Sequence, residues 1–119
     1  MTSAGFEAAL LNSEELQLVT VGRKTGRESA RPVWFVHRDG TLYLLPGDGR
    51  DSQWYRNALH TPTIRLSAGG TTQPATTRPI TDEMQVAAVV NAFRDKYGSD
   101  QISALYPRLE VAVEAHALG

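Results

Sequence analysis

The sequence predicts an α+β fold: a small antiparallel barrel of about six strands, flanked by two or three helices. Short stretches of alternating apolar and polar residues are separated by turn residues throughout the chain. Asp39-Gly40 lies between two such stretches, which is a strong hairpin signal. Strand patterns follow one another instead of alternating with helices, so parallel βαβ units are not indicated. The 119 residues are expected to form one domain, residues 1–119.

The first half of the chain is expected to contain one short helix and three strands. The helix covers residues 6–11 and ends at Asn12-Ser13. Strands are predicted over residues 16–21, 32–37 and 41–45, since β-branched and aromatic residues alternate with polar ones there.

A second helix and two more strands are predicted beyond the glycine-rich loop 46–49. Asp51 or Ser52 can cap a helix over residues 54–59, and Pro62 ends it. Strands are expected over residues 63–67 and 71–79, on either side of a Gly-Gly turn.

The longest helix begins after Thr81 or Asp82 and stops at Gly98. A last strand is expected over residues 108–114, with Leu109, Val111 and Val113 facing inward. The helix carries one apolar stripe that faces a core: Val86, Val89, Val90, Phe93 and Tyr97.

Composition excludes several classes of function. The 12 basic and 13 acidic residues give a net charge of −1, whereas a small nucleic-acid-binding domain is usually clearly basic. No apolar run approaches the ~18 residues of a membrane span. Glu7 lies where a signal peptide would be basic. Cysteine is absent, so disulfides and thiolate chemistry are excluded. We expect a cytoplasmic protein.

Motifs for common catalytic machinery are missing. The sequence has no G-x-G-x-x-G dinucleotide fingerprint, no P-loop spacing and no G-x-S-x-G nucleophile elbow. The three histidines (His37, His60 and His116) stand far apart and outside any metal motif, so no metal site is predicted.

Residues 22–31 form a locally basic segment. Four cations stand against Glu28, a local charge of 4 − 1 = +3. A glycine-bracketed turn with guanidinium groups and Thr25 suits a phosphate or a carboxylate; the alternative is a hairpin turn whose charges are only solvated. The cations are Arg23, Lys24, Arg27 and Arg31.

Aromatic residues lie close to this segment and to the glycine-rich loop. Trp34 and Phe35 follow the basic turn, and Trp54 and Tyr55 follow the loop. An apolar wall beside an anion-binding turn suits a planar cofactor that bears a phosphate. The alternative is that these aromatic residues are ordinary barrel core.

These motifs resemble the deazaflavin-dependent nitroreductase and quinone reductase family over about residues 16–68. The resemblance rests on LVTVGRKTGR at residues 18–27, PVWF at 32–35, Asp39-Gly40, Tyr43-Leu44, WYRN at 54–57 and Pro62.

The resemblance implies a split β-barrel that holds coenzyme F420, a deazaflavin with a phosphate and an oligoglutamate tail. The phosphate and tail would lie on Arg23, Lys24 and Thr25, and Arg31 would supply a basic residue that many relatives carry at position 29. The acidic loop 46–50, with Asp48, departs from the family pattern. Pro32, Val33 and Trp34 would run under the ring, Trp54 and Asn57 would complete the cofactor pocket, and Tyr106 would supply a substrate-side hydroxyl.

Three functions follow as alternatives. The first is an F420-dependent oxidoreductase that delivers a hydride to quinone-like, nitroaromatic or enone acceptors. The second is an FMN-binding oxidoreductase of the same barrel type, and the third is a non-enzymatic cofactor- or small-molecule-binding protein. A homodimer is expected, because small barrels often cover exposed strand edges by dimerising.

Overall fold

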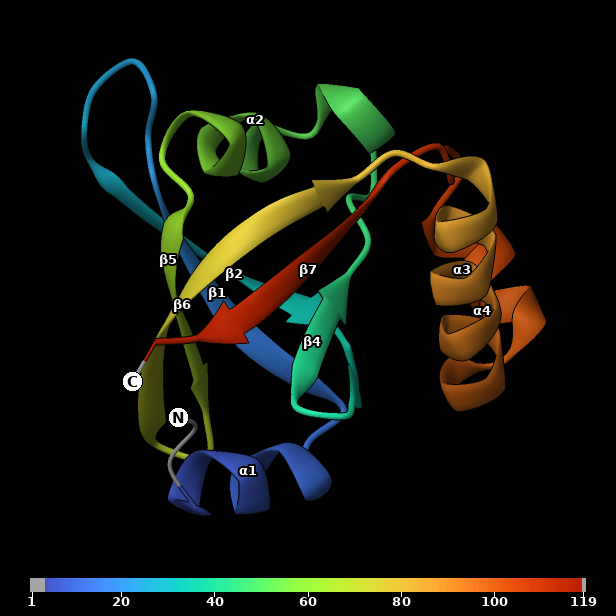
Figure 1. Cartoon of the computed structure of the whole chain (residues 1–119), viewed down its shortest axis with the longest axis horizontal. Helices are drawn as coiled ribbons and strands as arrows, with labels where there is room; N and C mark the ends of the chain where they lie inside the picture. The colour runs from blue at the N-terminus through green and yellow to red at the C-terminus, as the bar shows by residue number, and fades with distance from the viewer. Residues whose placement is uncertain (1–3, 119) are drawn as a thin grey trace.

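The computed structural model describes residues 4–118, which form seven strands, four α-helices and one 3-10 turn (Figure 1). The helices are α1 Ala4–Leu11, α2 Gln53–His60, α3 Glu83–Tyr97 and α4 Ser99–Leu105, and the 3-10 turn η1 is Gly49–Asp51. The strands are β1 Glu15–Val21, β2 Glu28–Trp34, β3 Val36–Arg38, β4 Thr41–Leu44, β5 Thr63–Ala68, β6 Thr71–Ile80 and β7 Ala112–Ala117.

All seven strands belong to one antiparallel sheet with the order β2-β1-β5-β6-β7-β4-β3. The two edge strands, β2 and β3, are nevertheless separated in the chain by Phe35 alone. A sheet can place consecutive strands at its opposite edges only if it curls, so the sheet forms a half-barrel. The predicted α+β class with a small antiparallel barrel is therefore confirmed.

Two side chains of α3 bind the backbone of Phe35, the residue that connects β2 to β3. The Tyr97 hydroxyl accepts a hydrogen bond from the Phe35 N–H at 3.1 Å and donates to the Glu14 carbonyl at 2.6 Å. The Lys96 ammonium donates to the Phe35 carbonyl at 2.7 Å and lies 3.6 Å from the centroid of the Phe35 ring. Phe35 is 1% exposed. Side chains of α3 thus supply hydrogen-bond partners for the Phe35 N–H and carbonyl, which lie between the two strands.

Each face of the sheet has its own core. One core gathers side chains of β1, β4, β5 and β7 with Phe6 of α1 and Trp54 of α2. The other packs Val36 and Leu45 against α3 and α4. In Figure 1, α1 and α2 lie at opposite ends of the sheet, and α3 and α4 pack at its side. The predicted stripe of α3 faces the second core, with Tyr97 packed at its margin.

Several boundaries differ from the expectation. The strand predicted over residues 32–37 is broken at Phe35, and its first part begins earlier, at Glu28. Gly98 ends α3 with φ of 96°, but α4 follows at once and was not predicted. The last strand starts at Ala112 instead of residue 108, because residues 108–110 carry ion pairs and do not join the sheet. Asp82 is confirmed as the cap of α3, since it accepts the Gln85 N–H at 3.0 Å.

No helix within residues 4–118 is long and apolar enough to span a bilayer.

We predict that Tyr97→Phe lowers the free energy of unfolding by about 1–3 kcal/mol, because the buried Phe35 N–H loses its acceptor. Urea denaturation measures the change. Tyr43→Phe is the matched control, since the Tyr43 hydroxyl forms no hydrogen bond with any residue in the described range. Equal stability of the two variants would show that the Tyr97 hydroxyl does not stabilise the connection between β2 and β3 at Phe35.

Candidate functional site

A pocket of about 420 Å³ opens between the end of β2, the loop before α2 and the end of α4. Its volume falls in the range of small-molecule sites. Six of the ten predicted site residues line it: Arg31, Pro32, Val33, Trp34, Trp54 and Tyr106. Residues that were not singled out as site residues complete the lining: Glu15, Leu45, Gly47, Asp48, Ser52 and Leu105.

The edge strand β2 supplies one wall of the pocket. Its residues up to Pro32 are exposed, and Val33 and Trp34 are half-buried. Proline has no N–H to offer a sheet, so Pro32 is compatible with an edge strand. Consecutive residues of a strand point to opposite faces, yet 31–34 all border the pocket, since it wraps the free edge of β2.

The aromatic wall is rigidly packed. The Trp34 ring stacks on Tyr97 with a centroid distance of 4.2 Å and an interplanar angle of 8°. The Tyr106 ring lies 6.3 Å from Trp34. One face of the Trp34 ring is therefore occupied by Tyr97, and Tyr97 is a packing residue, as its place in the helix stripe predicted.

Tyr106 combines a half-buried ring with a hydroxyl that has no hydrogen-bond partner among residues 4–118. Burial, with a smaller contribution from neighbouring Tyr97, raises the pKa of Tyr106 from 10.0 to about 12. Like that of an ordinary tyrosine, the hydroxyl is protonated at neutral pH and can donate a hydrogen bond. It forms none with the other described residues.

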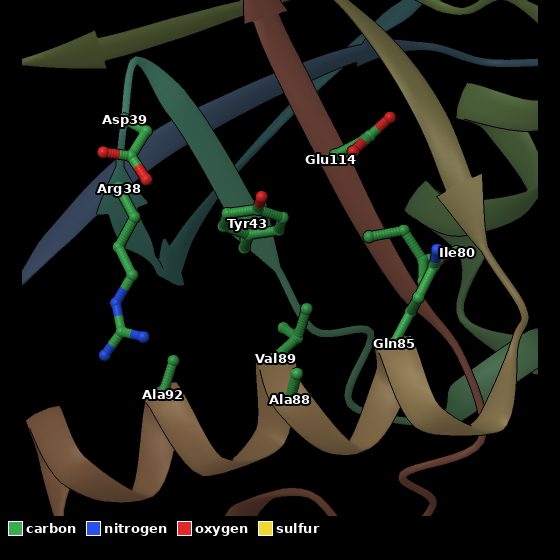
Figure 2. A pocket seen from close by; sticks show the side chains of 9 residues that line it. All are labelled: Arg38, Asp39, Tyr43, Ile80, Gln85, Ala88, Val89, Ala92 and Glu114. Atoms are coloured by element: carbon green, nitrogen blue, oxygen red, sulfur yellow. The ribbon is translucent and has the colours of Figure 1, made fainter.

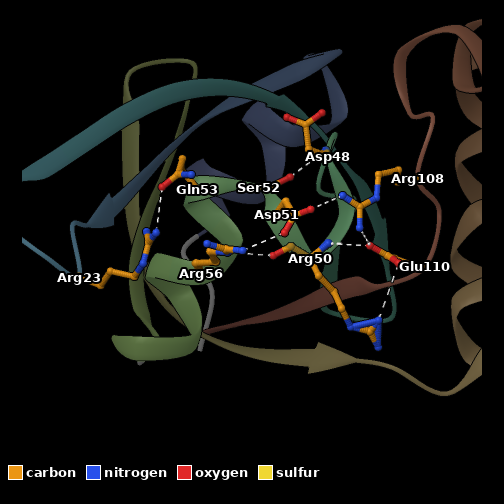
Figure 3. A network of polar contacts seen from close by, with 9 residues as sticks. All are labelled: Arg23, Asp48, Arg50, Asp51, Ser52, Gln53, Arg56, Arg108 and Glu110. Atoms are coloured by element: carbon orange, nitrogen blue, oxygen red, sulfur yellow. Dashed lines mark hydrogen bonds and ion pairs between the residues drawn. The ribbon is translucent and has the colours of Figure 1, made fainter.

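Loop 46–50 faces the pocket through Gly47 and Asp48. The Asp48 N–H donates to the Ser52 Oγ at 2.8 Å, which fixes the loop at the start of α2 (Figure 3). The pocket lining thus contains two carboxylates, Glu15 and Asp48, and one guanidinium, Arg31. The expected negative charge of this loop does lie beside the predicted cofactor residues.

The basic turn is closed by its own hydrogen bonds. The Gly22 N–H donates to the Arg27 carbonyl at 2.8 Å, and the Gly26 N–H donates to the Gly22 carbonyl at 2.8 Å. Thr25 Oγ1 accepts the Arg27 N–H at 3.2 Å. Gly26 has φ of 72°, a conformation that favours glycine. Thr25 therefore stabilises the turn by accepting this hydrogen bond.

Arg23 and Asn57 are bound to each other outside the pocket. Asn57 Oδ1 accepts both the Arg23 N–H at 3.2 Å and Arg23 Nη1 at 2.8 Å. Arg23 Nη2 donates to Gln53 Oε1 at 3.0 Å (Figure 3). Asn57 is 7% exposed. This pair anchors the β1–β2 hairpin on α2, a link between distant residues that the sequence motif alone does not reveal.

The cations that remain available are Lys24, Arg27 and Arg31. None of them forms an ion pair with another residue of 4–118. Glu28, the acid of this segment, is paired with Arg65 of β5, and this hydrogen bond lowers the pKa of Glu28. The hairpin accordingly carries three cations without ion-pair partners among residues 4–118: Arg31, which lines the pocket beside two carboxylates, and Lys24 and Arg27 of the turn.

A family model with the description "Uncharacterized protein conserved in bacteria (DUF2255)" matches residues 8–118. The chain belongs to the DUF2255 family.

Solved structures share the fold of this DUF2255 chain. An F420-H2 dependent reductase, FDR-A, superposes with a TM-score of 0.67 at 20% identity, covering 87% of this chain and 94% of its own. The HutZ haem storage protein of Vibrio cholerae gives 0.74 at 15% identity, covering 97% and 89%. A structure described as a domain-swapped dimer gives 0.68 at 22% identity, covering 87% and 80%. At these identities the likeness establishes the split-barrel fold alone.

A second hollow of about 340 Å³ lies between α3 and the sheet (Figure 2). It contains none of the predicted site residues. Ala88, Val89 and Ala92 form its helical side, and Arg38 and Gln85 lie toward its two ends. Its polar groups are spread around the rim and do not converge on one point in Figure 2. No cluster of three metal-ligating side chains occurs in the described part of the DUF2255 chain.

We predict that Asn57→Ala loosens the β1–β2 hairpin, because Arg23 loses its principal acceptor. Hydrogen bonds to charged groups are worth about 1.5–3 kcal/mol, so the free energy of unfolding should fall by a similar amount. Amide exchange at Gly22 and Gly26 should accelerate. Lys24→Ala, which removes a turn cation without a partner in the described structure, is the control and should leave the exchange unchanged. The same exchange rates in both variants would contradict the anchor.

Proposed function

We propose that the chain is an F420-dependent oxidoreductase that transfers a hydride from the reduced cofactor to a small quinone-like, nitroaromatic or enone acceptor. One observation carries the proposal: the pocket joins an aromatic wall, the Tyr106 hydroxyl and Arg31, and Arg31 lies on the strand that leads to the unpaired cations of the turn. An aromatic wall next to a cationic hairpin suits a planar ring with an anionic extension.

The described residues suit such a cofactor in two respects. Pro32, Val33 and Trp54 offer apolar contacts for a ring. Arg31, Lys24 and Arg27 offer charge for a phosphate and a tail that leaves the pocket along β2. The resemblance assigned the tail to Arg23 as well, but the bonds of Arg23 to Asn57 and Gln53 favour a positioning role for it.

When bound, reduced F420 supplies the hydride. The chain itself binds and orients the reactants, and its pocket keeps them close together. We assign Tyr106 as the catalytic residue: its neutral hydroxyl donates a hydrogen bond to the acceptor oxygen, where negative charge grows during reduction. Trp34, held by Tyr97, keeps the Tyr106 side of the pocket rigid.

A second candidate function is supported by the carboxylates of the pocket. Glu15 and Asp48 lie in the same lining as Arg31 and oppose a highly anionic ligand. This charge favours FMN, which has no oligoglutamate tail, or a non-enzymatic role in binding a cofactor or another small molecule. That a protein described as a haem storage protein shares the fold agrees with the binding role.

We also propose that the protein acts as a homodimer in the cytoplasm, as a single domain. The strands β2 and β3 are the two edges of the sheet, and a small barrel often covers such an edge with a second copy. A dimer is described for one of the structural neighbours.

The test is a fluorescence titration with F420 and, separately, with FMN. Trp34 and Trp54 are the two tryptophans of the chain and both line the pocket, so ligand binding should quench them to saturation. We expect saturation by F420. Removing two cations, Lys24→Ala with Arg27→Ala, should weaken F420 binding by roughly 10-fold or more, because charge-assisted contacts are lost.

Arg38→Ala is the matched control, since it removes a cation at the other hollow. It should leave F420 affinity unchanged. Saturation by FMN alone would indicate an FMN-binding oxidoreductase instead of an F420-dependent one. No quenching by either ligand would refute the cofactor proposal.

A further inference from the structure

A network of charged groups joins loop 46–52 to residues 108–110 (Figure 3). The Asp51 carboxylate accepts hydrogen bonds from Arg56 at 2.8 Å and from Arg108. The Glu110 carboxylate accepts from Arg108 at 2.7 Å and from the Arg50 N–H at 3.0 Å. Arg108 therefore bridges two carboxylates, one on each segment.

The backbone of the loop lies directly on the partner segment. Gly49 is buried and has φ of 57°. A Cβ atom at this position would collide with the Glu110 carboxylate and would lie 3.1 Å from the Arg108 Cβ. The loop and the 108–110 segment are thus in contact, with no room for a side chain between them.

The network adjoins the pocket lining along the chain. Gly47 and Asp48, which line the pocket, come just before Gly49–Asp51, and Leu105 and Tyr106, which also line it, come just before Arg108. The contact between the two segments therefore lies within four residues of lining residues on both of them.

We propose that Arg108 is a positioning residue: through Asp51 and Glu110 it clasps the loop that carries Asp48 to the segment that follows Tyr106. The clasp keeps the Asp48 loop and Tyr106 at a fixed separation and so tunes ligand affinity. Its effect on a ligand rests on the proposed function, whereas its effect on the loop does not.

The clasp is electrostatic and accessible to salt. The side chains of Arg108, Asp51 and Glu110 are 42%, 57% and 36% exposed. Ions screen exposed pairs strongly at about 1 M salt, where the Debye length is about 3 Å. The hydrogen bonds from Arg108 and from the Arg50 N–H lower the pKa values of Asp51 and Glu110, respectively, which agrees with both carboxylates being charged in the clasp.

The first test needs no ligand. Arg108→Met keeps much of the aliphatic stem and removes both ion pairs. Amide exchange at Gly49 and Arg50 should accelerate by roughly 2- to 30-fold, the range expected from losing two exposed pairs. Exchange at Leu18 and Leu66, paired in the sheet core, should not change. Asp51→Asn should act in the same direction, and Arg108→Lys should restore part of the protection.

Arg78→Met is the matched control. Arg78 is itself exposed and forms an ion pair with the mostly covered Glu114 at 2.7 Å, on the sheet and outside the pocket lining. It should leave exchange at Gly49 and Arg50 unchanged. Equal exchange in Arg108→Met and Arg78→Met, or acceleration that extends to Leu18 and Leu66, would overturn the clasp.

The second test uses F420 and FMN as probes. Affinity of the unmodified chain for the probe that binds should fall between about 0.05 and 1 M NaCl, and Arg108→Met should remove part of that salt dependence. Salt dependence that is identical in the two proteins would overturn the effect on affinity. Failure of both probes to bind would refute the proposed function, while the exchange measurements would still decide whether the clasp exists.

Discussion

The architecture depends on how the chain passes Phe35. The sheet places β2 and β3 at its two edges, and a single residue connects them. The backbone polar groups of that residue must be satisfied away from the sheet, and Tyr97 and Lys96 of α3 do so. Curling of the sheet and docking of α3 are therefore linked through the backbone of Phe35. Next to Phe35, the Trp34 ring stacks on Tyr97, and this stack fixes one wall of the pocket.

The charges around the pocket divide into structural and available groups. Arg23 is committed to Asn57, Arg65 to Glu28, and Arg108 to Asp51 and Glu110. Lys24, Arg27 and Arg31 remain for an anionic ligand. The sequence does not distinguish these arginines, because residue type and spacing do not report the partner of a guanidinium. Asn57 lies on α2, Glu28 lies on β2 and Asp51 lies in loop 46–52, and only folding brings them near Arg23, Arg65 and Arg108, respectively.

Structural features set by residues close together in the sequence could be predicted, whereas features set by contacts between distant residues could not. The Asp39-Gly40 hairpin, the Asp82 cap and the buried stripe of α3 follow from short-range geometry, and the structure confirms them. The break at Phe35 and the helix after Gly98 were missed, because tertiary packing by α3 overrides an unbroken strand pattern and a glycine stop. Six predicted site residues meet in one pocket: Arg31, Pro32, Val33 and Trp34 lie on β2, Trp54 lies on α2, and Tyr106 follows α4. The predicted start of β7 was wrong because Arg108 and Glu110 bind residues of the distant loop 46–52 and do not join the sheet.

The central claim is that one pocket, at the end of β2, is where a deazaflavin binds. Backbone chemical-shift mapping with F420 tests it most directly. The account predicts saturable shifts at Arg31, Val33 and Trp54, with Tyr106 included, and none in the hollow formed by Tyr43 and Ala88. Shifts confined to that second hollow, or no shifts at saturating F420, would contradict the account.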